Sequence, residues 1–159
     1  MYISYDEYTA LYDPIEGKLF NRLAFEACRY IDRLTTGADG VKKLQVAFPT
    51  DEDSAATVKR CAAHIINLLA QVQEAEQSAS LGRGFVQTAN GLQGRVISSV
   101  SSGSESISYS TGVGKTAVDT AAADPAAKSN MIYWTIRNYL SGTTDANGVN
   151  LLYMGRYPA

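Results

Sequence analysis

The sequence predicts a mainly α-helical protein of one domain: a small bundle of three main helices plus a short N-terminal helix, with a serine-rich β-hairpin and an extended C-terminal tail. Three observations lead to this fold class. Apolar residues recur at helical spacing in three long stretches. A helix start signal precedes each of them. Period-2 alternation is confined to one serine-rich stretch. The expected parts are a helical core at about 4–77 and 124–141, flexible loops at about 78–94 and 111–123, a hairpin at about 95–111 and a tail at 149–159.

The composition is that of an ordinary globular protein. Charged residues make up 19% and hydrophobic residues 45% of the 159 residues, and a chain of this length buries about two-thirds of its unfolded surface. The net charge of −2 argues against a dedicated nucleic-acid binder, but not against a protein that lines a passage for DNA. The acidic, aromatic N-terminus is unlike a signal peptide, and the most apolar run, Cys61–Ala70, is too short to span a bilayer. We therefore expect synthesis inside the cell, no membrane partner, and two reduced cysteines inside helices.

A short first helix carries a stripe of tyrosines. Ser4 and Glu7 have the spacing of a capping box, which opens this helix. Tyrosine combines a large apolar body with a polar tip and is enriched at protein interfaces. The stripe therefore either packs on the protein's own core or contributes to an interface. Spacings of three, three and four place its members on one helical face: Tyr2, Tyr5, Tyr8 and Tyr12.

Three longer helices follow. An aspartate before a proline opens the first and the third, and a threonine before three acidic residues opens the second. A glycine ends the first and the third. The expected helices span about 13–36, 50–77 and 124–140. Their apolar faces consist of Leu19, Phe20, Leu23, Ala27, Ile31 and Leu34; of Val58, Ala62, Ile65, Ile66, Leu69 and Val72; and of Ile132, Tyr133, Ile136, Tyr139 and Leu140.

Two segments outside these helices carry apolar residues that we expect to be buried in contacts with the rest of the protein or with a partner. The connection 37–49 contains an apolar patch that we expect to fold against the core. The last stretch is apolar and aromatic, although chain ends are usually polar. It must be held on this molecule or on a partner. The patch consists of Val41, Leu44, Val46 and Phe48, and the last stretch includes Leu151, Leu152, Tyr153, Met154, Arg156 and Tyr157.

The predicted hairpin is the only stretch with strand-like alternation. A two-residue turn at Ser102-Gly103 pairs Val100 with Glu105. This register puts hydroxyl side chains on one face and apolar side chains on the other. An isolated two-stranded ribbon is marginally stable in water, so it must lean on the helices or on a neighbouring subunit. Its apolar face consists of Val96, Val100, Ile107 and Tyr109.

Motifs that would suggest an enzyme are incomplete. Gly112–Thr116 ends like a phosphate-binding loop, but Tyr109 stands at the position of its first glycine, and the following residues are a poor start for the required helix. Cys61 and His64 could face one metal ion with Cys28, but structural zinc needs four ligands. The single histidine has no identifiable nucleophile beside it. We therefore expect a protein that is not an enzyme, with no cofactor, metal or catalytic residue.

Five pieces of the sequence, taken in order, resemble one family. They are Y-I-S-Y-D-E-Y at 2–8, A-F-E-A-C-R-Y-I-D-R-L-T at 24–35, V-K-R-C-A-A-H-I-I-N-L-L-A at 58–70, the serine-rich hairpin with the closing helix, and N-L-L-Y-M-G-R-Y at 150–157. Each piece alone is a common amphipathic pattern, and the likeness lies in their order across nearly the whole chain. In this order the chain resembles the head–tail connector, or adaptor, proteins of long-tailed bacteriophages and prophages.

The resemblance implies a structural virion protein without catalysis. Such a protein forms a ring, a dodecamer in the virion, that docks on the portal protein and extends the DNA channel toward the tail. The next neck protein, the stopper, binds to this ring. Genomic DNA passes through the lumen without sequence-specific binding. The protein would be made in the host bacterial cytoplasm and reside in the virion neck, between capsid and tail.

A ring with head-to-tail contacts needs two different surfaces on each subunit. We expect the hairpin to supply one of them, and we expect the tail, Leu151 to Tyr157, to dock on the portal or on the adjacent subunit. Loss of 149–159 should then leave a folded protein that no longer attaches to the portal. The alternatives are another phage neck or tail-completion protein, a small nucleotide-binding enzyme that uses Gly112–Thr116, and a DNA- or host-directed interaction module.

Overall fold

The protein is mainly α-helical, as the sequence predicts. The computed structural model describes residues 1–81, 85–88, 91–94, 100–102, 105–107 and 116–158, with side chains for 1–77 and 116–158. This part of the chain contains six helices, and none of them is long and apolar enough to cross a membrane. The helices are α1 (Tyr5–Thr9), α2 (Gly17–Thr35), α3 (Lys43–Val46), α4 (Glu52–Leu81), α5 (Ala117–Ala123) and α6 (Pro125–Leu140).

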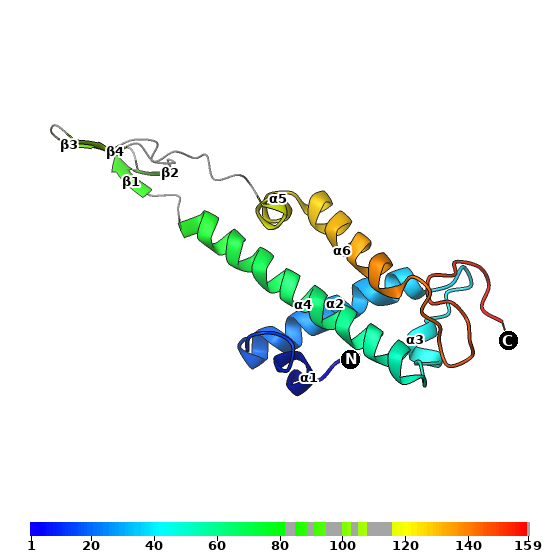
Figure 1. The fold of residues 1–159 in the computed structure, drawn as a ribbon. Helices are drawn as coiled ribbons and strands as arrows, with labels where there is room; N and C mark the ends of the chain where they lie inside the picture. Colours follow the sequence, from blue (N-terminus) through cyan, green and yellow to red (C-terminus); the bar gives the residue numbers. More distant parts are fainter. Residues whose placement is uncertain (82–84, 89–90, 95–99, 103–104, 108–115, 159) are drawn as a thin grey trace.

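The long helix α4 is the centre of the fold. α2, α5 and α6 all pack against it (Figure 1). Its middle turns are buried on several sides, which is the pattern of a helix enclosed by other helices. The apolar face predicted for this helix is confirmed, since all six of its residues are buried together with two small neighbours. The buried residues of α4 are Val58, Cys61, Ala62, Ala63, Ile65, Ile66, Leu69 and Val72.

The predicted start of α6 is confirmed, and that of α2 is wrong. The Asp124 side chain accepts a hydrogen bond from the Ala126 amide at 2.8 Å, with Pro125 as the first helical residue. By contrast α2 begins at Gly17, and Glu16 caps it without a side-chain hydrogen bond. The segment before α2 is held to α1 instead, because the Tyr5 hydroxyl donates to the Ile15 carbonyl at 2.8 Å. A tertiary contact therefore overrides the local start signal at 13–14.

The two predicted loops contain secondary structure. α4 continues to Leu81, and β1 (Phe85–Thr88) then pairs antiparallel with β2 (Gly91–Gly94). α5 occupies most of the second predicted loop. It opens with a capping box, in which the Thr116 hydroxyl accepts from the Asp119 amide and the Asp119 carboxylate accepts from Thr116. The expectation of a poor helix start there is wrong because this cap and the alanines after it both favour a helix.

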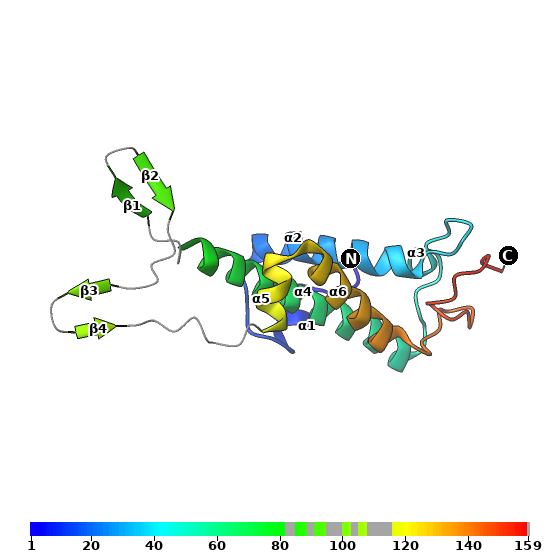
Figure 2. The same ribbon diagram turned by 90° about the horizontal axis from the view of Figure 1, so that it is seen from above.

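The register predicted for the serine-rich hairpin is wrong. β3 (Val100–Ser102) pairs antiparallel with β4 (Glu105–Ile107), and Val100 lies opposite Ile107 rather than Glu105. The shift is two residues, so Val100 and Ile107 still share a face of the ribbon. A single hairpin over 95–111 is not supported; Figure 2 shows two ribbons beyond the C-terminal end of α4.

The C-terminal segment belongs to the helical body and is not an extended tail. After α6, Gly142 adopts a φ of 83° and the chain turns back, with Thr144 and Asn150 forming an antiparallel bridge. Leu151 is 0% exposed and lies in the same core cluster as α2, α4 and α6. Both figures show this segment beside α3 (Figures 1 and 2). The expectation that residues 149–159 are dispensable for folding is therefore not supported.

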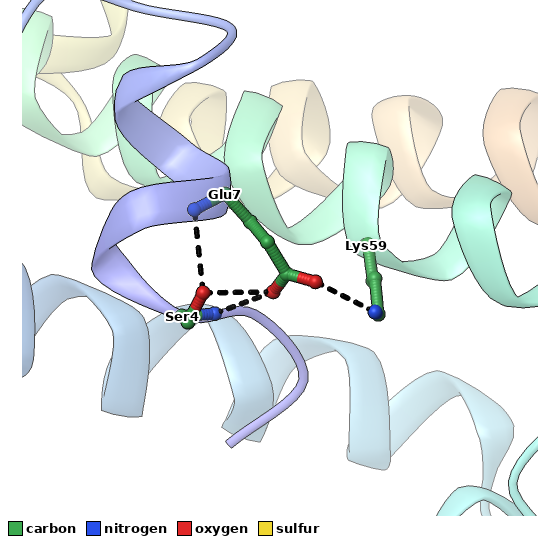
Figure 3. A network of polar contacts seen from close by, with 3 residues as sticks. All are labelled: Ser4, Glu7 and Lys59. Atoms are coloured by element: carbon green, nitrogen blue, oxygen red, sulfur yellow. Dashed lines mark hydrogen bonds and ion pairs between the residues drawn. The ribbon is translucent and has the colours of Figure 1, made fainter.

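A polar network fastens α1 to α4 (Figure 3). The predicted capping box is confirmed: the Ser4 hydroxyl accepts from the Glu7 amide, and the Glu7 carboxylate accepts from Ser4. The second carboxylate oxygen of Glu7 pairs with Lys59 on α4, with Nζ and Oε1 2.6 Å apart. The Lys59 ammonium, followed by the Ser4 amide, lowers the pKa of Glu7 to about 2.

The Glu7 network gives a pH-dependent contribution to stability. A carboxyl whose pKa is lowered on folding stabilises the protein above its unfolded pKa, and this contribution is lost as the pH falls toward the folded pKa. We expect Glu7→Gln to lower the free energy of unfolding by about 1 kcal/mol or less at neutral pH, because the pair is partly exposed. Between about pH 4.5 and 2 the difference from the unaltered protein should disappear. Urea unfolding of both proteins across this pH range measures the difference. A difference at pH 2 as large as at neutral pH would contradict the role of the Glu7 carboxylate. In a protein that already carries Lys59→Met, Glu7→Gln should have little further effect on stability.

The buried position of Leu151 makes the chain end part of the folding unit. Leu151→Ala should destabilise the protein by about 2–5 kcal/mol, as for other fully buried leucines. Met154→Ala, three residues away and 60% exposed, is the matched control and should change stability by about 0.5 kcal/mol at most. Denaturant unfolding monitored by circular dichroism measures both. Equal stability of the two variants would show that the segment is not packed as described.

Candidate interaction surfaces

A buried lysine fastens the C-terminal segment to the connection before α4. Lys43 begins α3 and is 0% exposed. Its Nζ atom donates to the carbonyl oxygens of Asn150 at 3.2 Å, of Leu151 at 3.0 Å and of Tyr153. An ammonium group has three protons, so each has a main-chain partner. It also lies 5.7 Å from the centre of the Tyr153 ring.

Main-chain carbonyl groups solvate this charge in place of water. Burial lowers the pKa of Lys43, while the negative charges of Asp145 and Asp39 raise it. In the described part of the chain no carboxylate forms an ion pair with Lys43. A buried charge without partners would be very unfavourable. The three carbonyl oxygens are therefore what permits this lysine to be buried.

Two aspartates hold the rest of the segment. Asp145 Oδ1 accepts from the amides of Asn147 and Val149, each at 2.9 Å, and Oδ2 accepts from the Tyr157 hydroxyl at 2.6 Å. The Tyr157 amide donates to Asp39 Oδ2 at 2.8 Å. The Asp145 carboxylate raises the pKa of Tyr157, and the Tyr157 amide lowers that of Asp39. The end of the chain is thus bonded to both aspartates.

The residues predicted as an interacting tail separate into two groups. Leu151 is buried, and Leu152 and Tyr157 are partly buried against the protein itself. The other three project into solvent, with Tyr153 52% and Met154 60% exposed. We call these three exposed residues the C-terminal surface: Tyr153, Met154 and Arg156.

The tyrosine stripe packs mainly on the protein's own core. Tyr8 is 1% exposed and stacks on Tyr12, whose hydroxyl lies 2.9 Å from His64 Nδ1. The Tyr2 hydroxyl donates to Asp32. Burial raises the pKa of Tyr2, Tyr8 and Tyr12. Of the two interpretations left open by the sequence, packing on the core therefore accounts for most of the stripe, and Tyr5 is its exposed member.

The predicted hairpin face lies partly within the described residues. Val96 and Tyr109 lie outside the described residues. The backbones of Val100 and Ile107 pair with each other, but their side chains are not described. This part of the predicted interaction surface stays a prediction.

The described residues give no support for the chemical motifs. They contain no group of three or more metal-ligating side chains that could hold a metal ion. Cys61 is buried, which raises the pKa of its thiol to about 12, and burial also lowers the pKa of His64. The Thr116 hydroxyl is used in the cap of α5. Gly112 to Lys115 lie outside the described residues.

Sequence reasoning missed one exposed surface on α2. Phe25 is 66% exposed, and Arg29 and Arg33 lie near it on the helix side opposite the buried stripe. Lys42 lines the same hollow, which has a volume of about 600 Å³. We call these four residues the α2 outer face. Positions 25, 29 and 33 recur every four residues, so a helical projection of the sequence could have found three of them.

Comparisons with known proteins found no match for the chain. No family model, curated protein or solved structure matched it in three comparisons.

Comparison of Lys43 with its neighbour Lys42 separates the effect of the three buried hydrogen bonds from the effect of losing a positive charge. Lys43→Met leaves three carbonyl oxygens without their donor and should lower the free energy of unfolding by about 2–3 kcal/mol. Hydrogen exchange of the Tyr157 amide should become faster in the same variant. Lys42→Met makes the same change at an exposed position and should cost about 0.5 kcal/mol at most. Equal effects of the two substitutions would contradict the proposed role of Lys43.

Proposed function

We propose that this chain is a structural protein of a bacteriophage neck. In this proposal it assembles as a head–tail connector ring on the portal protein, extends the DNA channel toward the tail, and receives the next neck protein. The order of sequence motifs is the basis of the proposal. The hairpin segment at 95–111 remains the expected site of one subunit contact.

The structural observation that best supports the proposal is the C-terminal surface. Its residues follow directly after Leu151, which is buried, and the main chain of the segment is bonded to Lys43. An apolar, aromatic and basic group on a firmly held segment loses little conformational entropy on binding, which favours docking on another protein. Tyrosine, methionine and arginine are also enriched at protein interfaces. We assign portal docking to Tyr153, Met154 and Arg156.

Electron microscopy of portal rings from the same genome, with and without the protein, tests the proposal. Added density beneath the portal is the expected result. Absence of that density, with the portal intact and the protein folded, would rule out portal docking and favour another neck or tail position.

A second measurement tests the C-terminal surface itself. Met154→Ser combined with Arg156→Ser should weaken portal binding about tenfold or more, because truncation of central interface residues commonly costs over 1 kcal/mol each. Leu11→Ser combined with Arg60→Ser removes an exposed apolar residue and an exposed arginine elsewhere and should bind normally. If the first variant also binds normally, portal docking does not use the C-terminal surface.

A further inference from the structure

The α2 outer face carries positive charge that the described part of the chain neutralises only in part. Within the described residues, Arg29, Arg33 and Lys42 form no ion pair and no side-chain hydrogen bond. Two carboxylates line the same hollow, and one of them has a cationic partner outside it. Glu26 lies 3.9 Å from Lys128, and Asp32 accepts hydrogen bonds from Tyr2 and Gln45. Because Tyr2 and Gln45 are neutral donors, the charge of Asp32 offsets one of the three cations, and an excess of positive charge remains for an external anion.

An exposed aromatic ring lies among these cations. Phe25 lines the hollow of about 600 Å³ and also a second hollow of about 470 Å³, and Arg29 and Lys42 line both. Two adjoining hollows that share an exposed ring suit the protruding side chains of a protein partner. Arginine and aromatic residues are enriched in the centres of protein interfaces. DNA phosphates would use the cations but would leave Phe25 in water.

The charge of the whole chain indicates which protein could bind there. The net charge is −2, so an excess of positive charge on one face requires an excess of negative charge over the rest of the molecule. Three consecutive exposed carboxylates, Asp51, Glu52 and Asp53, lie at the start of α4, so a second copy of the chain offers an acidic surface of complementary charge. We propose that the α2 outer face binds an acidic surface of a second copy of this chain. This inference deepens the proposed function, because it assigns to a named face one of the subunit contacts that a ring requires.

The test reverses the charge of this face. Arg29→Glu with Arg33→Glu should weaken self-association at least about tenfold in sedimentation equilibrium at low salt, because like charges then meet across the contact. Arg29→Lys with Arg33→Lys keeps the charge and should retain most of the affinity. Lys18→Glu with Arg60→Glu makes the same charge change at exposed positions off the face and should associate normally. Self-association of the unaltered protein should weaken as salt is added. Circular dichroism checks that every variant is folded.

Other outcomes overturn the inference. It is wrong if the charge-reversed variant self-associates as the unaltered protein does, or if the unaltered protein does not self-associate even when bound to the portal. It is also wrong if a short DNA duplex binds the unaltered protein and the charge reversal abolishes that binding, since the face would then serve phosphates.

The portal assay separates this inference from the proposed function. A complete collar formed by the charge-reversed variant would refute the inference and leave the connector role standing. The opposite result is also possible. The unaltered protein could self-associate in a salt-sensitive way, lose this association with Phe25→Ser and with the charge reversal, and yet form no collar on the portal. That result would support the inference and refute the connector role.

Discussion

The folded state of this protein depends on a charge that is taken out of water. The Lys43 ammonium is buried and has three main-chain carbonyl oxygens as partners. Because a desolvated ammonium needs all of its hydrogen bonds, the path of the chain at 150–153 is strongly restricted. The partners are at least 107 residues away in sequence. One side chain thus joins the connection before α4 to the end of the chain.

The helix α4 gives this junction a scaffold. α2 and α6 pack against it, and the core that they share extends from Tyr8 near the N-terminus to Leu151 near the C-terminus. Both ends of the described chain are therefore packed on the same body. The tyrosines of the N-terminal stripe supply apolar area to that core, while their hydroxyl groups find polar partners such as Asp32 and His64. A buried tyrosine requires such a partner, and each of these two partners comes from a different long helix.

The two proposed contact surfaces differ in how the fold holds them. The C-terminal surface has irregular backbone, and its position depends on Lys43 and on the burial of Leu151. The α2 outer face lies largely on a regular helix whose opposite side is buried against α4 and α6. In both cases exposed side chains project from firmly packed backbone. Such preorganisation reduces the entropic cost of binding.

The sequence by itself determined the mainly helical class, the cap of α1, the start and end of α6, and the buried face of α4, because periodicity and capping are local properties. It could not determine the docking of the C-terminal segment or the enclosure of Tyr8 in the core. It also could not determine that Lys43 is buried while Val46, which we expected to fold against the core, is 66% exposed. Those depend on which distant groups come together. A lysine next to an apolar residue looks exposed in any local pattern, and only the carbonyl oxygens of 150–153, brought to it by the folded helices, make its burial favourable.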